Sequence, residues 1–146
     1  MSRANAKSQH DKYIAFKKVF ETITHYLDQD NFLAAYVITF SLIEDRIRAM
    51  YVVQYRCVNE GKEPTPKLIN ASFANHVRLL QAAGVIPQAD SILLLEEDKI
   101  RNEQLHAAMW NLNAFTRLAV EQALGLARLA DKHRRAQKRL LEKNMK

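Results

Sequence analysis

Three side chains in one short stretch, Arg101-Asn102-Glu103-Gln104-Leu105-His106, have the chemistry needed to act on a phosphodiester. An arginine presents a planar fork of donors that fits a phosphate, an amide can hold an oxygen, and a histidine exchanges a proton near neutral pH. RNA supplies its own nucleophile, the 2′-hydroxyl, so its cleavage needs neither a metal nor a covalent enzyme intermediate. The stretch therefore predicts RNA cleavage by Arg101, Asn102 and His106 without a cofactor, giving 2′,3′-cyclic phosphate and 5′-hydroxyl ends.

The spacing of Arg101 and His106 sets a geometric condition on this chemistry. Five residues along a regular α-helix correspond to roughly 140° of rotation, so the two side chains would not face one phosphate. Either one turn of the helix is irregular, or the two groups act across a dimer axis. Each chain also supplies one such histidine, whereas cleavage uses both an acid and a base. We therefore expect a homodimer in which two chains contribute to one site.

The elements that position this stretch are expected to be helices. The 146 residues include only three Gly and three Pro, and they lack the valine and isoleucine alternation that marks strands. No interior Pro/Gly-rich linker divides the chain. The sequence therefore predicts one all-α domain over residues 1–133, built as an up-down bundle of four to five helices with two long ones, and a basic helix extension or tail over 134–146.

Apolar residues at three-and-four spacing delimit the first two expected helices. The first is predicted over Ser8–Gln29, with Ser8 as its N-cap. The second is predicted from about Phe32 to Val58, after a cap at Asp30 or Asn31. At this length it would extend roughly 40 Å, so we expect it to be the spine against which the other helices pack.

The second half of the chain is predicted to continue as helices. After a loop over residues 59–66, a helix over about Leu68–Ala83 should end at Gly84, which suits a left-handed C-cap. A further helix leads into residues 101–106. Beyond that stretch the apolar spacing continues almost to the end of the chain, so His106 is expected at the head of a long final helix.

Glu44 borders the apolar face of the second helix, because it follows Phe40 by four residues. Arg48 lies one turn further on and can form an ion pair with it. A carboxylate at such an edge can instead orient an active-site group from behind. We favour the structural pairing, and we name Glu44 as the best candidate for the supporting role.

The net charge of +6 is concentrated at the end of the chain. Residues 128–146 hold eight Lys and Arg against two carboxylates, so residues 1–127 are balanced. A basic helix end attracts a phosphate backbone or an acidic partner, and a solvated helix end is the alternative interpretation. The candidate RNA-binding residues are Arg134, Arg135, Lys138 and Arg139.

Other reactive side chains have structural interpretations. Cys57, on the apolar second helix, is expected to fill the core, and a single cysteine cannot form an internal disulfide. His76 is expected on the surface, and His133 within the basic end. Trp110 and Phe115 are predicted as core or dimer contacts rather than base-stacking platforms. The sequence holds neither a Gly-rich phosphate loop nor a paired-histidine zinc spacing.

The order of these features resembles the HEPN superfamily (higher eukaryotes and prokaryotes nucleotide-binding domains). The family pattern is an Arg, four to six residues and then a His, often with Asn directly after the Arg. Arg101, Asn102 and His106 match the form with four intervening residues. The resemblance covers about residues 10–130 in architecture, whereas its specific part is six residues long.

The resemblance implies a metal-independent endoribonuclease, often the toxin of a toxin–antitoxin or antiphage defence system, whose homodimer holds two motifs across one cleft. Arg101 would bind the scissile phosphate, Asn102 would hold the site geometry, and His106 would act as general base or acid. RNA is then the substrate, and an antitoxin protein is a further partner. Members whose partner nucleotidyltransferase modifies them carry a tyrosine two residues after the His. Ala108 stands at that position, which departs from this mode of neutralisation.

Three other interpretations stay open. Arg101 can pair with Glu97 or Glu103 on a surface helix, leaving His106 merely exposed. The chain can be a non-catalytic helical module that binds RNA or a protein, or an antitoxin or assembly subunit of a larger complex. No apolar run reaches signal-peptide or membrane-span length, and the single cysteine suits a reducing compartment. We therefore expect a cytoplasmic protein that has no membrane contact.

Overall fold

The computed structural model describes residues 2–111 and 114–144, with side chains described from residue 15 onwards. Helices are the main regular secondary structure of this part of the chain and it contains no strand, which confirms the expected all-α class. Its helices are α1 (Ser2–Asp28), α2 (Phe32–Val58), α3 (Pro66–Ile69), α4 (Phe73–Ala82), α5 (Gln88–Ala108) and α6 (Arg117–Asn144). The predicted count of four to five helices with two long ones is wrong, because the described residues form six helices and four of them are long.

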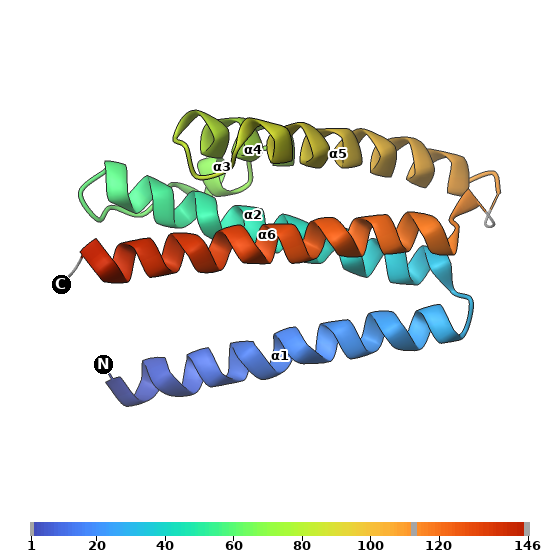
Figure 1. Ribbon diagram of the computed structural model, residues 1–146, viewed down its shortest axis with the longest axis horizontal. Helices are drawn as coiled ribbons and strands as arrows, with labels where there is room; N and C mark the ends of the chain where they lie inside the picture. The colour runs from blue at the N-terminus through green and yellow to red at the C-terminus, as the bar shows by residue number, and fades with distance from the viewer. Residues whose placement is uncertain (1, 112–113, 145–146) are drawn as a thin grey trace.

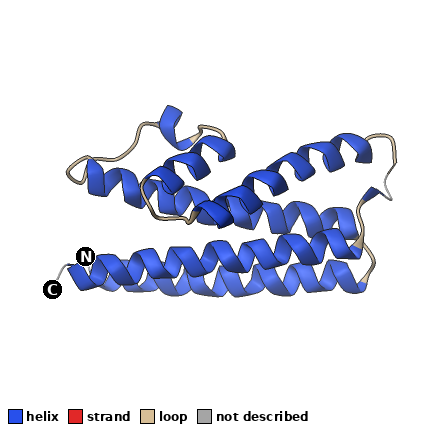
Figure 2. Cartoon of the chain, turned by 45° about the horizontal axis from the view of Figure 1, so that its top comes forward, coloured by secondary structure: helices blue, strands red, loops and turns tan. Residues whose placement is uncertain are grey.

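The long helices alternate in direction, as Figure 1 shows, and Figure 2 shows the N and C marks side by side at one end. Helices α1 and α5 run one way and α2 and α6 run the other, so the N- and C-terminal ends lie at the same end of the bundle. Helix α2 contacts α1, α3, α4 and α6. The spine predicted for this segment is therefore confirmed.

The bounds of α2 agree with the sequence-based expectation because a local cap starts the helix. The Asn31 side-chain oxygen accepts a hydrogen bond from the backbone N–H of Ala34 over 3.2 Å. One face of α2 is buried at three-and-four spacing, and each large side chain on it contributes roughly 1.5–3 kcal/mol on burial. The largest buried side chains of this face are Tyr36, Phe40, Ile43, Ile47 and Met50.

Helix α6 packs against α2 through a row of small residues. Val120, Ala123, Ala127 and Ala130 are fully buried and follow the same helical spacing. Small side chains let two helix backbones approach closely, so α6 lies along the central helix over much of its length. Further along α6, the side-chain nitrogen of Gln137 donates a hydrogen bond to the Met50 carbonyl oxygen over 3.0 Å.

The helix predicted over Leu68–Ala83 is divided into α3 and α4. The reason is local, because each short helix has its own N-cap. The Thr65 hydroxyl and the Ser72 hydroxyl each accept a hydrogen bond from the backbone N–H three residues further on. Gly84 has a φ of +76°, so the left-handed cap expected there is confirmed.

Two helix starts also differ from the expectation. The backbone is helical from Ser2, so Ser8 is not at the start of α1, and its side chain lies outside the described residues. Helix α5 continues without a break through residues 101–106, and α6 begins only at Arg117. His106 is therefore in the last turn of α5 rather than at the head of the final helix.

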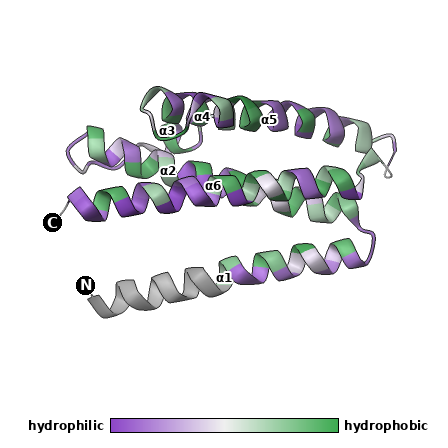
Figure 3. Ribbon diagram, viewed as in Figure 1, coloured by the Kyte–Doolittle hydropathy of each residue, from purple (hydrophilic) through white to green (hydrophobic). Residues whose placement is uncertain are grey.

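Helix α6 runs unbroken past residues 133 and 134, so the described part of the basic end is a helix. The division into residues 1–133 and 134–146 coincides with no structural boundary and stays a prediction, and residues 145 and 146 lie outside the described part. Figure 3 shows hydrophilic residues dominating the C-terminal part of α6. None of the described helices has both the length and the apolarity that crossing a membrane requires.

Candidate functional site

Arg101 points from α5 toward α2, where it is held on three sides. Its Nη1 donates to Glu44 Oε1 over 2.8 Å, and its Nη2 donates to Asp98 Oδ1 over 2.7 Å. The guanidinium carbon lies 4.2 Å from the centroid of the Phe40 ring. Its side chain is 22% exposed. Two carboxylates and one aromatic face therefore fix Arg101 in one orientation while part of the side chain still reaches solvent.

Glu44 makes its ion pair with Arg101, and the surface pairing with Arg48 is not formed. The alternative pairing of Arg101 with Glu97 or Glu103 is also wrong. The second partner is Asp98, which precedes Arg101 by three residues and so lies on the same face of α5. That spacing is visible in the sequence, whereas the contact with Glu44 depends on how α2 and α5 pack.

Glu97 instead forms a buried polar contact with α2. The Tyr36 hydroxyl donates to Glu97 Oε1 over 2.6 Å, and both residues are buried. Burial, and after it the hydrogen bond to Glu97, raise the pKa of Tyr36 far above its ordinary value. The Tyr36 ring also packs against Phe115, with ring centroids 4.8 Å apart. This contact fixes α5 against α2 one turn before Arg101.

Asn102 and His106 lie on the other side of α5. Both are exposed, and they share one face because they are four residues apart. Within the described part of the chain, neither side chain makes a hydrogen bond or an ion pair. Since α5 is a regular helix here, Arg101 and His106 point roughly 140° apart, and the irregular turn considered above does not occur. One chain alone does not bring Arg101 and His106 together.

Exposed apolar side chains lie within four residues of His106 at the end of α5. Leu105 is 38% exposed, Met109 75% and Trp110 83%. Trp110 is therefore not a core residue, whereas Phe115 is buried and belongs to the core. Exposed apolar groups clustered at one helix end are unusual on a solvated surface and are typical of a contact site.

Cys57 and His76 are placed differently from their interpretations, whereas His133 lies in the basic part of α6 as expected. Cys57 is exposed, so it does not fill the core. His76 is buried rather than on the surface, with its Nε2 2.9 Å from the Leu68 carbonyl oxygen. His133 is held by α5, because its Nε2 lies 2.6 Å from Asp90 Oδ2. The sequence carried no local signal for these contacts, since each joins residues that are close only in the folded chain.

The four candidate RNA-binding residues of α6 do not form one surface. Arg134 is half-buried beside Arg46, and burial and then the charge of Arg46 lower the pKa of Arg134. Arg135 and Arg139 line a groove between α1 and α6, whereas Lys138 is exposed and does not line it. Sequence reasoning missed Arg128 and Lys132 of the same groove, although their spacing from Arg135 and Arg139 follows one helix face.

Comparisons of this chain with protein-family models, with curated proteins and with solved structures find no match.

Proposed function

We propose that this chain is a metal-independent endoribonuclease of the HEPN type that acts as a homodimer. It cleaves RNA by attack of the 2′-hydroxyl, leaving a 2′,3′-cyclic phosphate and a 5′-hydroxyl. Arg101 stabilises the scissile phosphate, Asn102 holds the site geometry, and His106 transfers the proton. As a toxin or an antiphage defence effector, it would be restrained by an antitoxin protein in the cytoplasm.

The observation that carries this proposal is the division of the motif between two faces of a regular α5. A guanidinium and an imidazole on opposite sides of one helix meet at a phosphate only if a second copy supplies one of them. The exposed Leu105, Met109 and Trp110 provide an apolar surface next to His106 on which that second copy can dock. The arrangement thus favours a site shared between Arg101 of one protomer and His106 of the other.

The contacts of Arg101 suit a residue that stabilises charge as it develops. Glu44 and Asp98 each accept one hydrogen bond from the guanidinium, and Nε is buried without a partner among the described residues. The remaining N–H groups on Nη1 and Nη2 are available to a phosphate oxygen. A donor held in place before the reaction loses no energy to reorganisation at the transition state.

His106→Ala tests the chemistry. Loss of a general acid or base costs a factor of about 10²–10⁴ in rate. We expect such a loss in cleavage of a fluorescent RNA, with helix content by circular dichroism and dimerisation unchanged. The matched control is His25→Ala, which removes an exposed histidine from α1 and should leave the rate within about twofold.

Mixing two inactive variants tests whether the site is shared. In a heterodimer of His106→Ala with Arg101→Gln, one site combines the intact Arg101 of the first chain with the intact His106 of the second. Activity should therefore return to about half of the wild-type level per heterodimer, which is about a quarter averaged over all dimers when the co-expressed chains pair at random. If each chain held a complete site, or if one cleft needed both histidines as acid and base, this heterodimer would stay inactive.

A non-catalytic RNA-binding module is the second candidate, and one observation favours it. Two carboxylates already compensate the charge of Arg101, which reduces its attraction for a phosphate. In that case the wild-type chain would bind RNA without cutting it, and His106→Ala would leave its affinity unchanged. The cleavage assay and a binding assay on the same RNA separate these two functions.

A further inference from the structure

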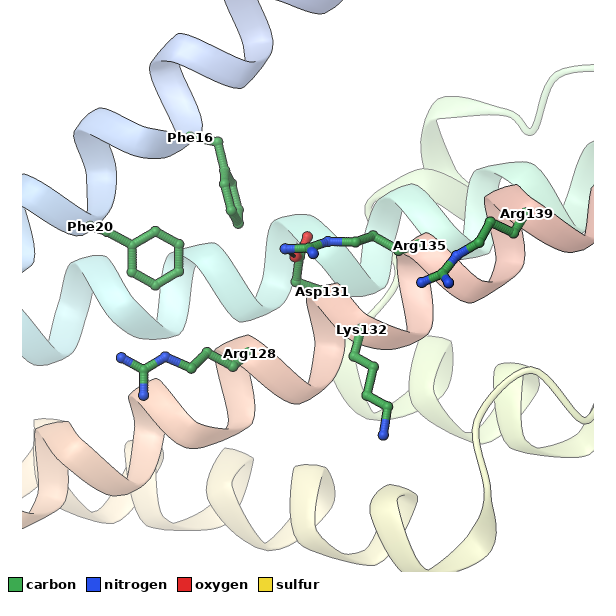
Figure 4. A pocket seen from close by; sticks show the side chains of 7 residues that line it. All are labelled: Phe16, Phe20, Arg128, Asp131, Lys132, Arg135 and Arg139. Atoms are coloured by element: carbon green, nitrogen blue, oxygen red, sulfur yellow. Dashed lines mark ion pairs between the residues drawn. The ribbon is translucent and has the colours of Figure 1, made fainter. Parts of the chain in front are cut away.

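A groove of about 430 Å³ opens between α1 and α6 on the surface of the bundle. Both helices pack against α2, which lies beneath them. Figure 4 shows Phe16 and Phe20 of α1 on one side of the groove and the basic residues of α6 on the other. We refer to it as the α1–α6 groove.

The basic residues of the α1–α6 groove form a row with little compensating charge. Arg128, Lys132, Arg135 and Arg139 follow one another at intervals of four, three and four residues, so they share one face of α6 over roughly 16 Å. Among the residues whose side chains the structure describes, the only carboxylate that lines the groove is Asp131, and it pairs with Arg135 at 2.5 Å. The other three cations have no carboxylate partner in the described part of the chain.

Two further arginines lie beside this row and add to its positive potential. The Arg46 guanidinium carbon is 4.3 Å from the centroid of Phe16, and Arg46 is close enough to Arg134 for its charge to lower the pKa of that residue. Asp45 lies 3.3 Å from Arg46 and is largely exposed, so it screens this charge weakly. The groove therefore combines uncompensated cations with aromatic side chains.

We propose that the α1–α6 groove binds single-stranded RNA, with phosphates on Arg128, Lys132 and Arg139 and a base against Phe20. A row of cations follows a phosphate backbone, and an aromatic side chain beside it takes the exposed face of an unpaired base. A duplex hides its base faces, and a run of Asp and Glu residues has no flat ring to place on the phenylalanine. The choice of RNA as ligand rests on the proposed function, although binding in this groove requires no cleavage.

The α1–α6 groove lies on the opposite side of α2 from Arg101. Glu44 reaches α5 and Arg46 reaches Phe16 of α1, and these two residues are two positions apart on α2, roughly 200° around the helix. The groove therefore holds a part of the RNA that is distant from the bond cut beside the same chain's Arg101. Its contribution is to retain a long strand rather than to align the scissile phosphate.

The test compares two triple variants with the same net charge in a His106→Ala chain, which leaves the RNA uncut. The groove variant is Arg128→Gln, Lys132→Gln and Arg139→Gln. The control variant is Lys62→Gln, Lys67→Gln and Arg78→Gln, which removes three exposed cations outside both the groove and the basic end of α6. The probe is a fluorescein-labelled 12-mer of uridine, and fluorescence anisotropy measures its Kd at several salt concentrations.

We expect the groove variant to lose affinity by about 30-fold or more and the control variant by less than about threefold. Three lost phosphate contacts should also reduce the slope of log affinity against log salt by about 2, since each contact on a single strand contributes about 0.7. Phe20→Leu should weaken binding by about tenfold without changing the salt slope, because stacking releases no counterions.

Equal losses in the two triple variants would overturn the proposal, because they would mean that net charge alone determines binding. It would also fail if the groove variant kept its RNA affinity but lost binding to phosphatidylserine vesicles or to polyglutamate. The proposed cleavage activity can be refuted without refuting RNA binding in the α1–α6 groove. One outcome separates the two proposals: the chain with its native His106 never cuts RNA, and the groove variant loses RNA affinity while the control variant keeps it. This outcome would refute the proposed nuclease activity and support RNA binding in the α1–α6 groove.

Discussion

The basic side chains on the two sides of α2 differ in how far nearby carboxylates compensate their charge. On the α5 side, Arg101 is placed between Glu44 and Asp98 and over the Phe40 ring, so its charge is compensated where it stands. On the α1–α6 side, four basic residues of one helix face have Asp131 as the one carboxylate lining the groove among the described side chains. The first arrangement fixes the position of a guanidinium, and the second leaves charge available to a ligand.

This difference predicts opposite contributions to stability and to binding. A half-buried arginine with two partners stabilises the contact between α2 and α5, because its removal leaves carboxylates without a counter-charge. An uncompensated row of cations repels itself slightly and therefore lowers stability, while it attracts a polyanion. Substitutions on the two sides should accordingly change the free energy of unfolding with different sizes and different signs.

Arg101→Met gives the largest expected effect. The change keeps most of the side-chain volume but leaves Glu44 and Asp98 facing each other without a cation. Because all three side chains are partly exposed, we expect a loss of about 2 kcal/mol rather than the larger cost of a fully buried pair. Urea unfolding followed by circular dichroism measures it. Arg128→Met, in the α1–α6 groove, should cost less than about 0.5 kcal/mol, and equal costs would remove the distinction between the two sides.

The positions of most helices could be predicted from the sequence because their signals are local. The apolar spacing of α2 and the cap at Asn31 act within a few residues, and so does the left-handed Gly84. The break before α6 could not be predicted in this way. Phe115 lies in the gap between α5 and α6, yet it is buried in the core and continues the apolar spacing. Periodicity reports which residues are buried, and it does not report whether the backbone between them is helical.

The residue types of the candidate site are visible in the sequence, but their arrangement is not. The pairing of Arg101 with Glu44 joins residues 57 positions apart, so it exists only after α2 and α5 have packed. The α1–α6 groove has one half that sequence can show, the basic row on α6. Its other half, Phe16 and Phe20, looks like ordinary core spacing until α1 is placed beside α6.

Tyr36→Phe tests the buried polar contact between α2 and α5. It removes the donor to Glu97 and leaves a buried carboxyl oxygen without its partner, which should cost about 1.5 kcal/mol at pH 7. In the folded chain the pKa of Tyr36 is raised from its ordinary value of 10.0, so the unfolded chain loses this proton first as the pH rises. Stability from Tyr36 is therefore complete below pH 10 and is lost above it, at up to about 1.4 kcal/mol per pH unit.

Urea unfolding at a series of pH values between 9 and 11 checks this dependence. The wild-type chain should lose stability above about pH 10, and Tyr36→Phe should show a shallower decline there. Tyr51→Phe is the matched control, because burial and then Tyr55 also raise the pKa of Tyr51, but no hydrogen bond contributes to that shift. It should change the slope less than Tyr36→Phe does. Identical slopes in the wild type and Tyr36→Phe would mean that the Tyr36 hydroxyl is not held as described.

The smallest expected effect concerns the α1–α6 groove, and the sign of the change in the free energy of unfolding is what tests it. Lys132 has Arg128 four residues before it and Arg135 three residues after it, so Lys132→Gln relieves like-charge repulsion. It should raise the free energy of unfolding by about 0.3 kcal/mol at low salt, and the gain should vanish in about 1 M NaCl. Lys99→Gln on α5 should have the opposite sign, because Lys99 lies between Glu96 and Glu103 at helical spacing. A loss of stability in Lys132→Gln would mean that the row is compensated by nearby charge, and the groove would then have no free positive charge with which to hold a phosphate.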